Sequence, residues 1–197
     1  MKRFITIIAI LFSCLALRAE EKVGMYHSSY FDVDYSIEAG YNSRNVLTVY
    51  VQVEGEHSSD KVFFNFDGGD IDYFVKALKL AKEKFVEWQD IAIKNNVTDM
   101  RKDLDISFPR TTIAWLGSKW WFSFNKRLSP EFVVSSEGDI LFLITGKAVS
   151  SSNEYIDMKY YFALSRASDF DELIEALNIE KITEHFNKKQ NVEDLFK

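Results

Sequence analysis

The sequence has 197 residues, with 24 lysines and arginines against 30 aspartates and glutamates, which gives a net charge of −6 at neutral pH. This acidic balance argues against nucleic acid and anionic membrane surfaces as partners, because both would be repelled. The length suits one domain of ordinary size, and two prolines and eight glycines leave no obvious linker within it.

The N-terminal segment, residues 1–19, predicts a secretory signal peptide. A basic start at Lys2 precedes an apolar run that ends at Leu17, and Ala19 supplies the small residue expected at a cleavage site. The run is shorter than the roughly 20 apolar residues of a membrane-spanning helix. We therefore expect cleavage after Ala19, a periplasmic or secreted location, no transmembrane helix in the mature chain, and a single α+β domain over residues 20–197.

A lipoprotein signal is the alternative, because Leu11-Phe12-Ser13-Cys14 resembles the motif that places a lipidated cysteine at the mature N-terminus. In that case the protein would be anchored to the membrane through Cys14. Phe12 is bulkier than the residue usual at its position, and this favours simple cleavage. Cys14 is the only cysteine, so its removal leaves no disulfide and no thiolate ligand. Cleavage also removes three basic residues, which lowers the net charge to about −9.

Three segments in the first half alternate apolar and polar residues as half-buried strands do. They are residues 31–37, 46–53 and 61–66. In the second segment Val49 and Val51 face one side while Tyr50 faces the other. In the third segment Phe63 takes the outward side.

The apolar period then changes from two to three and four, which predicts an amphipathic helix of about 25 residues. Asp70 is the expected N-cap, and the helix should end near Asn95. The apolar stripe expected to pack on the sheet consists of Ile71, Phe74, Leu78, Ala81, Phe85, Trp88 and Ala92. The following residues, 96–105, are predicted to form a polar connection.

Five more strands and a shorter helix are predicted in the second half. The strands are residues 110–116, 119–125, 130–135, 139–149 and 153–165. The helix begins with Ser168 as N-cap and runs to Phe186. The predicted fold class is therefore α+β, with antiparallel β-meanders of about eight strands and with one long and one shorter helix packed on the sheet.

The main functional hypothesis comes from the aromatic segment WLGSKWWFSFNK, residues 115–126. Gly117-Ser118 suits a two-residue type II′ turn, which would pair Trp115 with Trp120 and Ala114 with Trp121. Strand alternation then puts Trp121 on the solvated second face of the sheet. The residues expected on the core face are Ile113, Trp115, Trp120, Phe122 and Phe124.

Four aromatic residues are candidate ligand-binding residues on this second face: Tyr50, Phe63, Trp121 and Tyr161. Aromatic rings set among short polar side chains can stack on a sugar, a peptide or another apolar ligand. Aromatic residues also have high strand propensity, so the alternative is a structural role beneath another element.

No motif for catalysis or metal binding is recognisable. The histidines His27, His57 and His185 have no partner at a spacing that would indicate a metal site or a catalytic pair. The acidic run Asp67-Gly68-Gly69-Asp70-Ile71-Asp72 lacks the spacing of an EF-hand calcium loop. There is also no P-loop, no dinucleotide-binding glycine turn and no GxSxG motif. We therefore expect no catalytic residue, no metal site and no cofactor.

These observations favour an exported, noncatalytic binding or interaction protein of the bacterial cell envelope. Its partner would be an unidentified protein or small ligand. One alternative is a structural subunit of an envelope assembly, which would use a sheet edge or an apolar patch. A carboxylate-dependent hydrolase is less favoured, because Asp103 and Asp105, two residues apart in a strand-like stretch, should both face solvent.

Overall fold

A computed structural model describes residues 20–194, with side chains up to Lys189, and combines two antiparallel sheets with three helices. The predicted α+β class is confirmed. The predicted signal peptide, with Cys14 and the cleavage site after Ala19, lies outside the described residues. Among residues 20–194, no helix combines the length and the apolar character needed to cross a membrane.

The ten strands divide into a six-stranded and a four-stranded sheet. The larger sheet has, in spatial order, β1 (Glu21–Ser28), β2 (Val33–Tyr41), β3 (Leu47–Val53), β4 (Lys61–Asp67), β6 (Thr111–Leu116) and β7 (Trp120–Lys126). The smaller sheet has β10 (Asn153–Leu164), β9 (Ile140–Ser150), β8 (Pro130–Val134) and β5 (Met100–Asp103). The two sheets are joined where the backbones of Glu54 and Tyr161 form a bridge, with N···O distances of 3.0 and 2.9 Å.

Two of these strands were not predicted, so the expected number of eight was too low. β5 lies within the segment expected to be a polar connection, and it pairs with β8 at the edge of the smaller sheet. Its residues Arg101, Lys102 and Asp103 are exposed, so no apolar alternation marks it. In β1 a bulge between Lys22 and Gly24 interrupts the alternation that would have revealed the strand.

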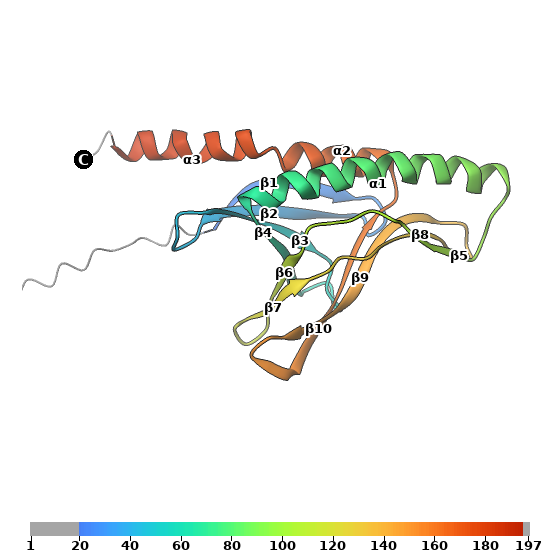
Figure 1. The fold of residues 1–197 in the computed structure, drawn as a ribbon, viewed down its shortest axis with the longest axis horizontal. Coiled ribbons are helices and arrows are strands. Elements are labelled where there is room, and N and C mark those ends of the chain that lie inside the picture. Colours follow the sequence, from blue (N-terminus) through green and yellow to red (C-terminus); the bar gives the residue numbers. More distant parts are fainter. Residues whose placement is uncertain (1–19, 195–197) are drawn as a thin grey trace, which may run out of the picture.

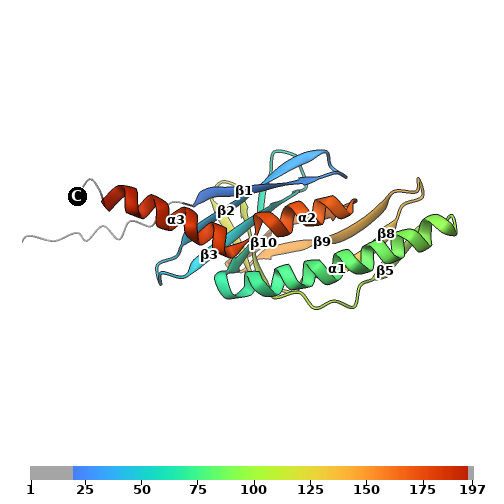
Figure 2. The same ribbon diagram turned by 90° about the horizontal axis from the view of Figure 1, so that it is seen from above.

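The three helices lie together on one side of the sheets (Figure 1). They are α1 (Gly68–Lys94), α2 (Ala167–Ala176) and α3 (Ile179–Asp194). Seen from above, α2 lies alongside α1, and α3 continues beyond α2 (Figure 2). The predicted single helix is therefore two helices. The side chain of Asn178 starts the second one by accepting hydrogen bonds from the backbone N–H groups of Glu180 and Lys181, both at 3.1 Å.

The apolar stripe of α1 packs on the sheets as predicted. All of its members are buried except Trp88, which is half-buried, and the Phe74 ring stacks on Phe66 of β4 at 4.4 Å. The expected cap was wrong by one turn, since the N-cap residue is Asp67 and Asp70 lies in the first turn. α2 likewise begins after Arg166 instead of Ser168.

One apolar cluster connects both sheets with the helices. The Phe64 ring of β4 contacts Phe162 of β10 at 5.9 Å between centroids, so the two sheets face each other there. The Phe85 ring of α1 lies 5.5 Å from Phe170 of α2 and 5.9 Å from Phe132 of β8. The inner face of the six-stranded sheet is therefore covered by the helices and by the second sheet.

Candidate functional site

The β6–β7 hairpin sets which aromatic side chains reach solvent, and its predicted register was wrong. Leu116 pairs with Trp120, and Trp115 pairs with Trp121. The loop thus contains three residues, Gly117 to Lys119, instead of two. Gly117 does not adopt the positive φ that a type II′ turn requires. A shift of one residue moves every following side chain of β7 to the opposite face of the sheet.

The neighbouring tryptophans therefore exchange their expected places. Trp121 is half-buried and packs against the core, with the Lys119 ammonium 4.4 Å from its ring centroid. Trp120, Phe122 and Phe124 were expected in the core, but they lie on the opposite, outer face of the sheet. Their exposed fractions are 40%, 38% and 60%. Trp115 and Ile113 are buried on the inner face, as predicted.

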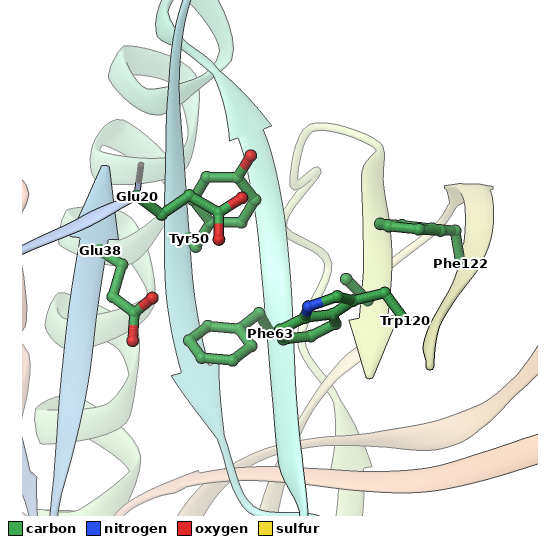
Figure 3. Close-up of a pocket in the computed structure, with 7 residues that line it drawn as sticks. Glu20, Glu38, Tyr50, Phe63, Trp120 and Phe122 are labelled. Atoms are coloured by element: carbon green, nitrogen blue, oxygen red, sulfur yellow. The ribbon is translucent and has the colours of Figure 1, made fainter. Parts of the chain in front are cut away.

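The outer face carries a small pocket of about 130 Å³, which we call the outer-face pocket (Figure 3). It is lined by Glu20, Glu38, Tyr50, Phe63, Ala114, Trp120 and Phe122. These residues come from five successive strands, β2, β3, β4, β6 and β7, and from the residue that precedes β1. In Figure 3 the labelled side chains project to one side of the strands and surround a common space.

Strand pairing explains the shape of the pocket. Phe63, Ala114 and Phe122 form one cross-strand row, because Phe63 pairs with Ala114 and Ala114 pairs with Phe122. The small alanine between two phenylalanines leaves a depression in the sheet face. Trp120 lies 5.9 Å from Phe63 between ring centroids, and Tyr50 lies 6.5 Å from Phe63 on the other side. Phe63 is only 4% exposed, so it forms the base of the aromatic wall.

Two carboxylates face the aromatic rings. Figure 3 shows the Glu20 carboxylate beside the Tyr50 ring and the Glu38 carboxylate turned toward the same space. Glu38 also accepts a hydrogen bond from the Ser36 hydroxyl at 3.1 Å. Burial raises the pKa of the Tyr50 hydroxyl, and the negative charges of Glu20, Asp67 and Glu38 raise it further. The Tyr50 hydroxyl therefore stays neutral, and the pocket carries negative charge.

A second, more polar hollow of about 510 Å³ adjoins the pocket on the same face. Tyr50 and Phe122 line both spaces. The polar hollow also contains two arginines, Arg44 and Arg110, and two aspartates, Asp67 and Asp70. Arg110 donates a hydrogen bond of 2.9 Å to the backbone carbonyl of Asn125, which fixes it beside β7.

The four predicted site residues are not all brought together. Tyr50 and Phe63 line the outer-face pocket, whereas Trp121 lies on the inner face. Tyr161 belongs to β10 of the other sheet, opposite Thr145, and does not line the pocket.

Five of the seven lining residues were not among the predicted site residues: Glu20, Glu38, Ala114, Trp120 and Phe122. Glu38 could have been found by extending the alternation of strand 31–37 by one residue, because it lies on the same side as Ser36. Placing Trp120 and Phe122 on the outer face requires knowledge of the length of the hairpin loop.

Nothing in the described part of the chain groups three His, Cys, Asp or Glu side chains closely enough to hold a metal ion. The chemistry of the pocket is thus that of aromatic rings and carboxylates. Comparisons with protein-family models, with curated proteins and with solved structures return no match. Function is therefore inferred from the geometry of the site.

Proposed function

We propose that this chain is an exported, noncatalytic binding protein of the bacterial cell envelope, and that the outer-face pocket is its ligand site. The observation that carries the proposal is the group of aromatic side chains around a depression on a sheet face that none of the described helices covers. Trp120 and Phe122 keep 40% and 38% of their surface exposed. Large apolar side chains gathered on an open face of a protein mark a binding surface more often than scattered ones do.

The sequence supports the cellular location in this proposal. Residues 1–19 have the charged start, the apolar run and the small residue of a secretory signal. Mass spectrometry of the native protein tests this point, and the expected N-terminus is Glu20. An N-terminus at a lipidated Cys14 would instead indicate a membrane-anchored lipoprotein.

A capture experiment tests the pocket. The mature protein is immobilised and exposed to the envelope fraction of its own cells, and the retained proteins and small molecules are identified. Trp120→Ala should lose the retained ligand because it removes one wall of the pocket. The matched control is Tyr155→Ala, which removes an aromatic ring that is 88% exposed on β10 and does not line the pocket. Equal retention by both variants would contradict the proposal.

A structural subunit of an envelope assembly is the second candidate, and helix α1 provides the observation that favours it. Tyr73, Leu80 and Ile91 are 63%, 55% and 50% exposed. Spacings of seven and eleven residues correspond to about two and three helical turns, so the three side chains share one face of the helix. Sedimentation velocity of the mature protein tests this candidate. Self-association that Leu80→Glu abolishes and Trp120→Ala preserves would favour the subunit.

A further inference from the structure

We propose that the outer-face pocket binds the organic ammonium group of a small soluble ligand, with choline as the representative compound. The inference rests on the proposed binding function of the same pocket and specifies its ligand class. Four of the seven lining residues are aromatic, two are acidic and none is basic. A cation is the occupant that both the ring faces and the carboxylates attract.

The aromatic part of the lining favours a cation with an apolar surface. The face of an aromatic ring carries partial negative charge, and a weakly hydrated ammonium group can approach it closely. Tyr50, Phe63 and Trp120 follow one another across three strands, with centroid separations of 6.5 and 5.9 Å. Phe122 closes the opposite side of the pocket, where Ala114 forms the floor.

The carboxylates supply negative charge that no basic side chain of the described residues neutralises in an ion pair. In the part of the chain that the structure describes, neither Glu20 nor Glu38 forms an ion pair. By contrast, Glu21 on β1 pairs with Lys189, and Glu56 in the β3–β4 loop pairs with Lys159 at 2.7 Å. The charge of Glu38 is therefore available to a ligand. Glu20 also faces the pocket, but in the mature chain its own α-ammonium group would lie next to its carboxylate.

The size and surroundings of the pocket restrict the ligand further. A volume of about 130 Å³ accepts one compact group, since sites for whole drug-sized molecules usually measure roughly 300 to 1,000 Å³. An anion would be repelled by both carboxylates. The acidic chain would also be repelled by an anionic bilayer, and this favours a small soluble ligand over a lipid headgroup.

Isothermal titration of the mature protein with choline and with its neutral isostere, 3,3-dimethylbutan-1-ol, tests the charge preference. The two compounds have nearly the same shape, so a difference in affinity reports the positive charge. We expect saturable choline binding and at least a roughly tenfold weaker interaction with the isostere. Added salt should weaken choline binding, because part of the attraction is electrostatic.

Glu38→Gln is the informative variant, because it keeps the size of the side chain and removes its charge. Cleavage after Ala19 would place the α-ammonium group of the chain on Glu20 itself. A substitution of Glu20 would then report on both charges, whereas a substitution of Glu38 changes one carboxylate only. Glu38→Gln should weaken choline binding by about tenfold and leave the isostere unchanged. Trp120→Ala should remove binding of both compounds, whereas Tyr155→Ala should change neither.

The outcomes separate this inference from the proposed function. Equal affinity for choline and its isostere would overturn the ammonium assignment and leave the pocket as a binding site. If neither compound binds while capture from the envelope fraction still depends on Trp120, the ammonium assignment fails and the proposed function stands. Binding to phosphatidylcholine vesicles that free choline does not displace would overturn the assignment to a small soluble ligand.

Discussion

The two faces of the six-stranded sheet are built from the same strands, and they differ in what covers them. On the inner face Ile37, Val51 and Phe64 are fully buried beneath the helices and the second sheet. On the outer face Trp120 and Phe122 rest mainly on neighbouring side chains and remain about two-fifths exposed. Aromatic residues occur on both faces, so residue type alone does not separate core from surface. The elements that cover each face determine which aromatic side chains are core and which are surface.

The outer face is itself divided into two regions. Toward β1 and β2 it carries polar cross-strand contacts, such as His27 with Asp34 at 2.8 Å and the Ser36 hydroxyl with the Gln52 side chain at 2.8 Å. Toward β7 it carries the aromatic rings of the pocket, which come from β3, β4 and β7. A face that needed only solubility could be polar throughout. The aromatic region therefore marks the place where binding is expected.

The largest expected effect comes from truncating a phenylalanine to alanine on the inner face and, for comparison, on the outer face. Phe64→Ala should lower the free energy of unfolding by about 3 to 5 kcal/mol, because it leaves a cavity among Tyr160 and Phe162. Phe122→Ala on the outer face should cost about 1 kcal/mol or less. Urea denaturation of both variants measures the difference. Similar large losses would show that the outer face is also buried, for instance in an oligomer.

The tryptophan pair gives the next largest effect and tests the hairpin register. Trp121→Ala should cost roughly 2 to 3 kcal/mol, since its ring packs partly into the core. Trp120→Ala should cost about 1 kcal/mol. Chemical denaturation of the two variants decides between the registers. A larger loss for Trp120→Ala is what the two-residue turn predicts, and it would contradict the three-residue loop.

This register also shows how far the sequence determines the site. Alternation and helical periodicity were enough for eight strands, for α1 and for the outward placement of Tyr50 and Phe63, because these patterns reflect local geometry. The length of the Gly117 loop depends on which turn fits the twist of the paired strands, and Gly-Ser is compatible with both two and three residues. Alternation can place Glu38 on the outer face. Its position opposite Tyr50, and the position of Glu20 at the pocket, depend on pairing between strands, which one-dimensional patterns do not contain.

The core between the two sheets should also resist added volume. Gly146 of β9 pairs with Tyr160 of β10, and a Cβ at Gly146 would lie 2.7 Å from Cζ of the tyrosine ring. The ring is buried against Phe64 and cannot move aside freely. Gly146→Ala should therefore cost about 1 to 3 kcal/mol. Gly69 in the first turn of α1 has no atom within 4 Å of the same position, so Gly69→Ala should be neutral or stabilise by about 0.5 kcal/mol. Thermal unfolding compares the pair, and equal effects would contradict the close packing.

The smallest expected effect concerns the polar region of the outer face. His27 on β1 lies opposite Asp34 on β2, with 2.8 Å between Nδ1 and Oδ1, and Asp32 lies 3.7 Å from its Nε2. The hydrogen bond to Asp34 is the main cause that raises the pKa of His27 above its usual value, and the charges of Asp34, Asp32 and Asp169 add to it.

A raised pKa in the folded state means that the folded protein holds this proton more tightly than the unfolded chain. The resulting stabilisation is complete below the unfolded pKa, which is about 6.5 for histidine, and it disappears as the pH rises through the folded pKa. His27→Gln should therefore reduce stability at pH 5.5 and have little effect at pH 8.5, which urea midpoints at the two pH values would measure. Asp34→Asn should remove most of this pH dependence. A His27→Gln effect of the same size at both pH values would mean that the histidine acts through packing and not through its charge.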